Sequence, residues 1–81
     1  MPNIKIYSTP FCAYCKAAKE YLTERGFAYN DIDVAHNYEK SEEMIEKSGQ
    51  MGVPVIDING EIVIGFDRSA IDKALGLKHA V

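Results

Sequence analysis

The step Asn59-Gly60 constrains the fold more than any other feature of this chain of 81 residues. It stands inside the stretch VPVIDINGEIVIGF, between two runs that are rich in β-branched residues. An Asn-Gly step reaches the positive φ angles of a tight two-residue turn at little cost, so the stretch predicts an antiparallel hairpin. The last two strands therefore form an antiparallel pair, and the earlier segments must pack against that pair.

The rest of the chain alternates between strand patterns and helix patterns. The strands are predicted from β-branched runs, and the helices from apolar residues at intervals of three and four. Each helix pattern stops at a glycine, Gly26, Gly49 or Gly76, and Asn37 stands in position to cap the second helix. In chain order we predict a strand at 3–7, a helix at 13–25, a strand at 28–34, a helix at 36–49, the hairpin, and a helix at 67–77.

The order β-α-β-α-β-β-α predicts an α/β fold with one four-stranded mixed sheet flanked by three helices. The first two strands are joined through a helix, so we expect them to be parallel with a right-handed crossover. One sheet with helices on its faces is the simplest way to bury all three apolar helix stripes. The sequence shows no linker, repeat or low-complexity tract, and we expect residues 1–81 to form a single domain.

Charge and hydropathy argue against several classes of function. The net charge is −3, from 9 basic and 12 acidic residues, and no run of Lys or Arg occurs that would attract nucleic acid or a membrane. No apolar run approaches the ~20 residues of a membrane span, and MPNIKIYS lacks the pattern of a signal peptide. We expect a cytoplasmic monomer that binds neither nucleic acid nor membranes.

Cys12 and Cys15 are the two cysteines of the chain, and they form a C-x-x-C pair after the first predicted strand. Such a pair binds a metal, closes a structural disulfide, or cycles between dithiol and disulfide. A closed structural zinc site needs four ligands, usually two such pairs or one pair plus two histidines. The only histidines are His36, after the second predicted strand, and His79, in the last three residues, so the pair has no second knuckle and we expect no metal site. A disulfide between residues this close would constrain little of the unfolded chain, and the cytoplasm would tend to reduce it.

The redox interpretation of the pair has a direct physical basis. Cys12 stands at the start of a helix, where unpaired N–H groups and the positive end of the dipole stabilise a thiolate and lower its pKa. Cys15 follows three residues later on the same helix face, so the two sulfurs can meet. We therefore predict that Cys12 is the exposed nucleophile and that Cys15 is the shielded resolving thiol.

Two segments resemble a known family. IYSTPFCAYCKAAKEYL resembles the active-site segment of glutaredoxins, and SEEMIEKSGQMGVPVIDINGEIVIGFD resembles their later segment, so the resemblance covers nearly the whole chain. It implies a thioredoxin-like fold and a dithiol thiol-disulfide oxidoreductase that acts through Cys12 and Cys15. Such an enzyme reduces protein disulfides or glutathione mixed disulfides. It has no bound cofactor, and glutathione is a candidate co-substrate and reductant.

The resemblance also implies a binding site for glutathione or a peptide. The proline that matches Pro54 is cis in this fold and packs beside the cysteines, and the backbone of Val53 hydrogen-bonds the ligand. From the residues alone, Pro54 would be an ordinary proline at the start of a strand. Gly65 and Asp67 match the glutathione-binding turn of the family. The implied binding residues are Tyr14, Gln50, Val53, Pro54, Gly65, Phe66 and Asp67.

Some residues depart from the glutaredoxin pattern and raise an alternative. Ala13 replaces the usual proline of the motif, and Thr9 stands where glutaredoxins often carry a lysine that helps bind glutathione. Ile64 and Phe66 do not match the Gly-Gly-x-Asp turn, and GFDRSAID resembles the ending of NrdH-type redoxins, without their Arg-Pro step. The alternative is an electron carrier that thioredoxin reductase reduces and that donates to ribonucleotide reductase or a peroxidase.

Several side chains near the motif have two interpretations. Phe11 and Phe66 form either an apolar docking rim around Cys12 or ordinary packing, and the sequence does not separate the two. Lys16 and Lys19 are more simply solvated helix surface than helpers of the thiolate. The acidic residues of the second predicted helix are most simply a solvated face; they are Glu39, Glu42, Glu43 and Glu46.

Overall fold

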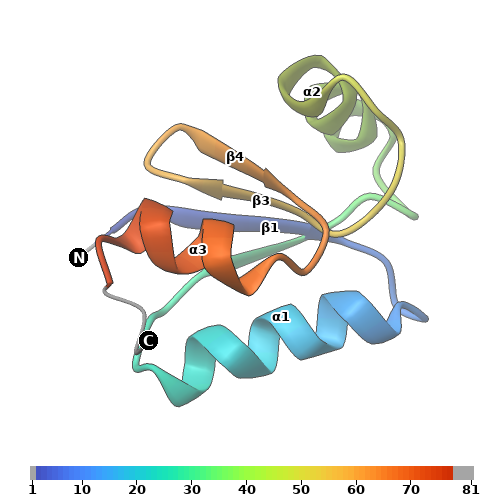
Figure 1. The fold of residues 1–81 in the computed structure, drawn as a ribbon. Helices are drawn as coiled ribbons and strands as arrows, with labels where there is room; N and C mark the ends of the chain where they lie inside the picture. Colours follow the sequence, from blue (N-terminus) through green and yellow to red (C-terminus); the bar gives the residue numbers. More distant parts are fainter. Residues whose placement is uncertain (1, 78–81) are drawn as a thin grey trace.

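The computed structural model describes residues 2–77, and its elements follow the predicted order β-α-β-α-β-β-α (Figure 1). The predicted α/β class and the four-stranded mixed sheet are confirmed. The first strand is shifted by one residue from the predicted range 3–7, and the second is shorter than 28–34. The elements are β1 (Ile4–Ser8), α1 (Ala13–Glu24), β2 (Asn30–Asp33), α2 (Tyr38–Ser48), β3 (Val55–Ile58), β4 (Glu61–Ile64) and α3 (Arg68–Leu75).

The strands lie in the order β2-β1-β3-β4. β1 pairs with β2 in parallel and with β3 antiparallel, and β3 pairs with β4 antiparallel. Asn59 and Gly60 form the hairpin turn with φ angles of 52° and 93°, which is the conformation that this step favours. Both the parallel first pair and the predicted hairpin are therefore confirmed.

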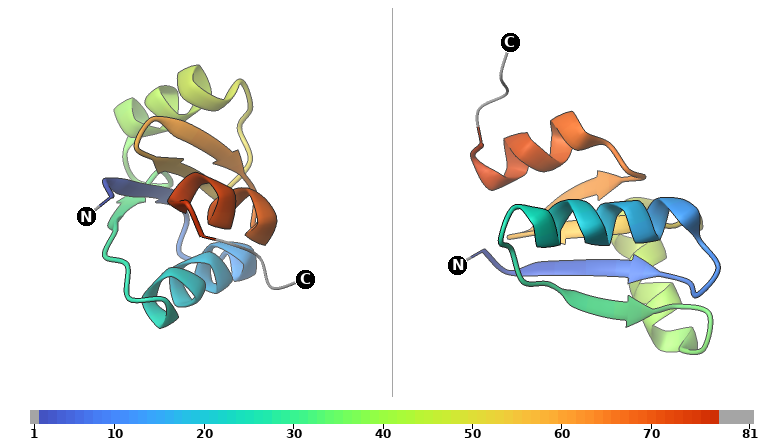
Figure 2. Two further views of the ribbon diagram at one scale, coloured as in Figure 1. Left: turned by 60° about the vertical axis from the view of Figure 1, so that its left-hand side comes forward. Right: turned by 90° about the horizontal axis from the view of Figure 1, so that it is seen from below.

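The sheet separates two unequal apolar layers, with α1 and α3 on one face and α2 on the other (Figures 1 and 2). Side chains alternate along each strand, so Ile4 and Ile6 lie on the α1 side while Tyr7 lies on the α2 side. Each fully buried isoleucine contributes about 1.5–3 kcal/mol to stability. The larger layer contains Ile4, Ile6, Ala18, Tyr21, Leu22, Ile56, Ile58, Val63 and Ile71, and the smaller contains Tyr7, Met44 and Val55.

A side chain caps the N-terminus of each helix. Cys12, Asn37 and Asp67 each accept a hydrogen bond from the backbone N–H three residues later. Gly49 and Gly76 end α2 and α3 in the left-handed conformation, as their positions predict. The cap of α1 is unusual because its acceptor is a sulfur, so the start of this helix and the position of the first cysteine are one feature.

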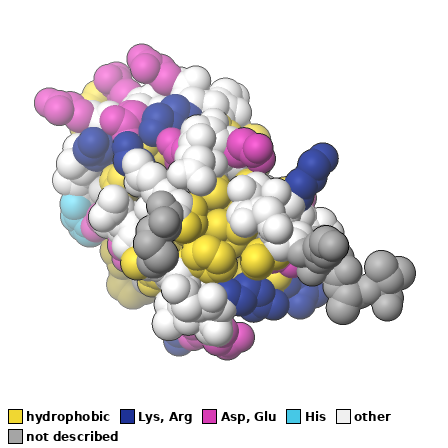
Figure 3. All heavy atoms as spheres, turned by 90° about the vertical axis from the view of Figure 1, so that its left-hand side faces the viewer, with side chains coloured by type: hydrophobic (Ala, Val, Ile, Leu, Met, Phe, Trp, Pro, Cys, Tyr) yellow, Lys and Arg dark blue, Asp and Glu magenta, His cyan; other side chains and the backbone are white. Residues whose placement is uncertain are grey.

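The two ends of the molecule differ in character. Figure 3 views the end where β1 begins and α1 finishes, and hydrophobic side chains reach the surface in the middle of this end. The C-x-x-C pair lies at the opposite end, where β1 finishes and α1 begins (Figure 1). No helix within residues 2–77 is both long and apolar enough to cross a bilayer.

Candidate active site

Cys12 lies at the junction between β1 and α1, with extended backbone angles of φ −121° and ψ 111°. The backbone N–H of Cys15 donates to Cys12 Sγ at 3.1 Å, and the N–H of Lys16 donates to the Cys12 carbonyl at 3.1 Å. A backbone N–H so placed binds a thiolate more strongly than a thiol, and the positive end of the helix dipole acts in the same direction. The structure thus gives Cys12 the surroundings that the sequence predicts for a nucleophile.

Cys15 has the opposite surroundings. Cys15 is buried, with 1% exposed, whereas Cys12 is half-buried. Burial raises the pKa of the Cys15 thiol, the hydrogen bond with Cys12 raises it further, and the result is about 11. Cys15 therefore holds its proton at neutral pH in the reduced protein, while Cys12 is the more exposed of the two cysteines.

The raised pKa of Cys15 predicts that the reduced protein loses stability at alkaline pH. The folded protein binds this proton more tightly than the unfolded chain, whose thiol has its ordinary value of 9.0. The stability that this difference in proton binding gives the folded protein is fully present below about pH 9. It falls by about 2 kcal/mol by pH 11. We expect urea unfolding of the reduced protein at pH 8 and pH 10.5 to show the loss. Cys15→Ser, the control, should lack this part of the change; an equal loss in both proteins would contradict the assignment.

The loop before β3 meets the turn after β4 beside Pro54. The peptide bond between Val53 and Pro54 is cis, as the resemblance implied, and Pro54 is buried. The N–H of Gly65, whose φ is 78°, donates to the Pro54 carbonyl at 2.8 Å. The structure therefore brings Val53, Pro54 and Gly65 together from two segments that are separated along the chain.

Two other implied binding residues have partners within the protein. Gln50 Nε2 donates to the Gly52 carbonyl at 3.0 Å, so its amide must leave this bond to donate to a ligand. The Asp67 carboxylate accepts from the N–H of Ala70 at 3.1 Å and caps α3. Asp67 therefore has a structural task that is independent of any ligand.

The aromatic residues near the pair divide into two kinds. Phe11 is fully exposed and Tyr14 is 69% exposed, and they stand directly before and two residues after Cys12. Phe66 instead packs against the core, with its ring edge-on to Tyr21 at a centroid distance of 5.6 Å. Ordinary packing therefore explains the position of Phe66 but not that of the fully exposed Phe11.

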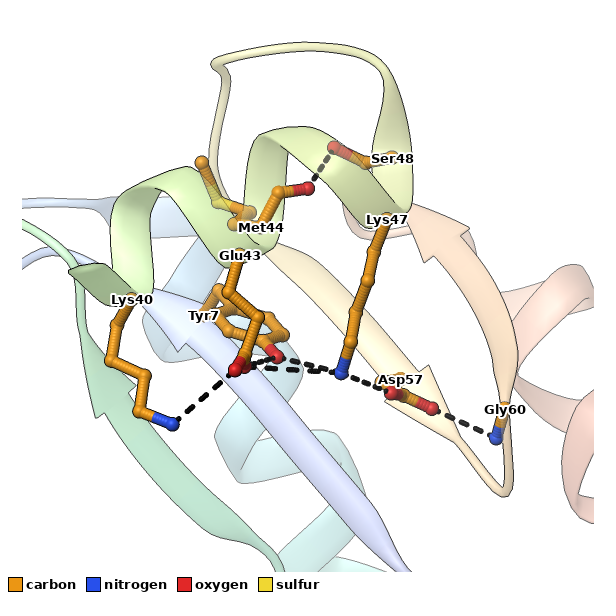
Figure 4. Close-up of polar contacts among 8 residues, drawn as sticks. All are labelled: Tyr7, Lys40, Glu43, Met44, Lys47, Ser48, Asp57 and Gly60. Carbon is orange, nitrogen blue, oxygen red and sulfur yellow. Dashed lines mark hydrogen bonds and ion pairs between the residues drawn. The ribbon is translucent and has the colours of Figure 1, made fainter. Parts of the chain in front are cut away.

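A polar network beneath α2 was not predicted (Figure 4). Lys47 Nζ donates to Asp57 Oδ2 at 2.8 Å and to the Tyr7 hydroxyl at 2.9 Å, and this hydroxyl donates to Glu43. Asp57 Oδ1 accepts from the N–H of Gly60 in the hairpin turn at 2.8 Å. The solvated interpretation of Glu43 is therefore wrong. The sequence feature that could have revealed this network is the position of Lys47, three residues after the core residue Met44 on the same helix.

An ion pair between Lys19 and Asp31, on the other side of β1, was also not predicted from the sequence. Lys19 Nζ lies 2.6 Å from Asp31 Oδ2, and Ser8 Oγ donates to the other oxygen of Asp31 at 2.7 Å. Lys19 therefore links α1 to β2 and is not simply solvated surface. Its charge acts on Cys15 by lowering the pKa, although burial of that thiol has the larger effect.

The histidines take no part in a metal cluster within the described residues. His36 Nδ1 lies 2.8 Å from Asp33 Oδ2, and His79 lies outside the described residues. Within residues 2–77, no group of three or more His, Cys, Asp or Glu side chains is arranged to hold a metal ion.

Comparison with known proteins identifies similar sequences. Residues 4–63 match the family model described as glutaredoxin. A glutaredoxin-like 8.6 kDa protein in the rubredoxin operon of Clostridium pasteurianum is 49% identical over 72 residues, which cover 89% of this chain and 96% of that protein. Glutaredoxin 3 of Escherichia coli (strain K12) is 37% identical over 78 residues, which cover 95% of this chain and 94% of that protein.

Comparison with solved structures supports the same fold. NrdH-redoxin from Escherichia coli, a glutaredoxin-like protein with a thioredoxin-like activity profile, superposes with a TM-score of 0.77 at 28% identity. The match covers 98% of this chain and 99% of that one. The arrangement of four strands and three helices is thus the thioredoxin-like fold that the sequence resemblance implied.

Proposed function

Because this chain belongs to the glutaredoxin family of thiol-disulfide oxidoreductases, we propose that it reduces protein disulfides or glutathione mixed disulfides through Cys12 and Cys15. The observation that carries the proposal is the asymmetry of the pair. The sulfur of Cys12 accepts a helix N–H at 3.1 Å and this residue is partly exposed, whereas Cys15 is 1% exposed. A nucleophile needs the first environment, and a thiol that acts only after the nucleophile needs the second.

The reaction transfers two electrons in two exchanges. The Cys12 thiolate attacks one sulfur of the substrate disulfide, forms a mixed disulfide, and releases the other sulfur as a thiolate. Cys15 then loses its proton and attacks Cys12 Sγ. This step releases the second substrate thiolate and leaves a Cys12–Cys15 disulfide. The substrate is reduced to two thiols, and the pair is oxidised.

The surroundings of Cys15 explain why it attacks only after Cys12 has formed the mixed disulfide. In the reduced protein, the hydrogen bond and the charge of Cys12 both contribute to the raised pKa of Cys15. Both contributions disappear when Cys12 is bound in a mixed disulfide. Cys15 then becomes easier to deprotonate at the step that requires its thiolate.

The reductant distinguishes two candidate functions. Glutathione as reductant is supported by Gly65, which bonds to the Pro54 carbonyl beside Val53 and so resembles the glutathione-binding turn. The alternative is an NrdH-type carrier reduced by thioredoxin reductase, which donates to ribonucleotide reductase or a peroxidase. The alternative is favoured by Thr9 in place of lysine and by the similarity to NrdH-redoxin. We propose the glutathione-coupled function first.

A paired assay tests which reductant serves the protein. Consumption of reduced nicotinamide is followed with hydroxyethyl disulfide as substrate, in one arm with glutathione and glutathione reductase and in the other with thioredoxin reductase alone. We expect the rate of the first arm to exceed the second by at least about tenfold, because only the first uses the turn at Gly65. Cys12→Ser gives the background of each arm. Turnover confined to the thioredoxin reductase arm would replace the proposal with the carrier function.

A further inference from the structure

The face of α2 that points away from the sheet is uncovered. Within residues 2–77, α1 and α3 lie on one face of the sheet and α2 lies on the other without a neighbouring helix (Figures 1 and 2). The inner face of α2 buries Met44 against Tyr7 and Val55. Its outer face presents Tyr38, which is 72% exposed, and the following loop presents Met51, which is 79% exposed.

These exposed side chains border a shallow hollow of about 460 Å³. Its members on the helix recur at intervals of three and four residues, so they share one face of α2. Tyrosine and methionine are enriched at protein interfaces, and the flexible thioether of methionine adapts to different partners. We call this hollow the α2 groove; its lining residues are Tyr38, Ser41, Glu42, Ile45, Glu46 and Met51.

The groove has an acidic rim. Glu42 and Glu46 line it, and Glu39 lies one turn before Glu42; within residues 2–77, none of the three carboxylates has a hydrogen bond or ion pair. Their neighbour Glu43, in contrast, pairs with Lys40 and Tyr7. Acidic side chains gather visibly over α2 at the upper left of Figure 3. The free carboxylates thus lie where a partner would meet them.

The stability of the helix does not explain the position of these charges. Glu39 lies in the first turn, where the helix dipole favours a carboxylate. Glu46 lies in the last turn, where the dipole disfavours it, and Glu42 stands four residues before it, at a spacing where like charges repel. A cationic partner would remove both unfavourable contributions.

The groove adjoins the loop that leads to the candidate active site. Met51 stands two residues before Val53, and Val53 precedes Pro54 in the loop that meets the Gly65 turn. A partner that contacts Met51 is therefore already on the segment that borders the proposed substrate site. This continuity connects docking at α2 with delivery of a disulfide to Cys12.

We propose that the α2 groove binds a segment of the disulfide-bearing partner protein in which apolar side chains are flanked by lysine or arginine. Tyr38, Ile45 and Met51 of the groove contact the apolar side chains, and Glu42 and Glu46 pair with the flanking cations. A second copy of this chain is a poor occupant, since it would bring the same carboxylates together at a net charge of −3 per chain. The proposal rests on the proposed function only for the statement that the partner carries a disulfide.

A binding titration tests the groove without any redox step. The probe is the peptide KRFLRK with blocked ends, added to ¹⁵N-labelled full-length protein that carries Cys12→Ser and Cys15→Ser. We expect amide shifts to concentrate at residues 38–46 and 51, with an affinity on the order of 100 μM. Because this protein has no thiols, the result does not depend on the outcome of the reductant assay.

Matched variants separate the groove from general attraction between opposite charges. We expect Glu42→Lys with Glu46→Lys to weaken binding at least about fivefold, and Glu20→Lys with Glu24→Lys on α1 to weaken it less than about twofold. Met51→Ser should weaken binding about threefold or more, unlike Leu77→Ser at another exposed apolar position. Equal weakening by both charge pairs, shifts centred elsewhere, or a dimer formed through this face would each overturn the proposal.

Discussion

Replacing Cys12 with serine is expected to abolish disulfide reduction, with a loss of at least about a thousandfold in turnover. A serine hydroxyl does not ionise near neutral pH and forms no disulfide, so neither the first attack nor the mixed disulfide remains. Nothing else in the described site replaces it, because Cys15 is 1% exposed and its pKa is raised to about 11. Turnover of hydroxyethyl disulfide with glutathione and glutathione reductase measures the effect.

Replacing Cys15 with serine is expected to divide the reaction. Exchange between Cys12 and a glutathione mixed disulfide needs one thiol, so its rate should stay within about threefold of that of the unchanged protein. Reduction of a protein disulfide needs the resolving step, so Cys15→Ser should accumulate a covalent complex with its substrate. Intact-protein mass spectrometry without reductant detects this complex.

The two cysteine variants also control for each other. Cys12 is partly exposed, so serine is well tolerated there, whereas a serine at position 15 places a hydroxyl where the side chain is 1% exposed. An unsatisfied buried hydroxyl costs about 1–3 kcal/mol, so Cys15→Ala is the second variant for this position. Activity that survives in Cys12→Ser and disappears in both Cys15 variants would reverse the assigned roles.

Much of the fold is readable because it depends on short-range chemistry. The Asn59-Gly60 turn, the Asn37 cap and the glycines that end α2 and α3 each act within a few residues of their own position. The ends of the second strand, in contrast, are not determined by residues close to it in the sequence. β2 is an edge strand, and its pairing with β1 runs only from Asn30 to Asp33. The neighbouring strand therefore sets its length, and the sequence overestimated it.

In the candidate site, too, features that depend on nearby residues could be predicted and those that depend on distant residues could not. The cysteines were predicted correctly as a helix cap and a buried partner, because three residues and one helix start determine both positions. Tyr7, Lys47 and Asp57 come from three different elements, and their contact depends on how α2 crosses the sheet. In the sequence, Lys47 has the appearance of one more surface cation. Roles that depend on such long-range contacts were therefore missed.

Replacing Lys47 with methionine is expected to lower the free energy of unfolding by about 2 kcal/mol. The lysine stem packs as methionine can, but the Asp57 carboxylate, with a side chain 13% exposed, would lose the cation 2.8 Å away. An uncompensated carboxylate at such a position costs more than the loss of a surface ion pair. Lys40→Met is the matched control, because Lys40 pairs with Glu43 on the same helix at 3.4 Å and is more exposed. We expect urea unfolding at pH 7 to show less than about 0.5 kcal/mol for the control.

The pH dependence and the double variant identify the pair as the cause. Burial alone would raise the pKa of Asp57, but the hydrogen bonds from Lys47 and Gly60 outweigh it and hold the pKa below its ordinary value of 3.8. The stability from the pair is thus present above pH 3.8 and disappears as the pH falls through the lower folded value, where the variant should match the unchanged protein. Asp57→Asn keeps an acceptor for Gly60, so adding it to Lys47→Met should recover part of the loss. Additive losses, or a deficit that persists in acid, would instead assign the effect to packing of the lysine stem.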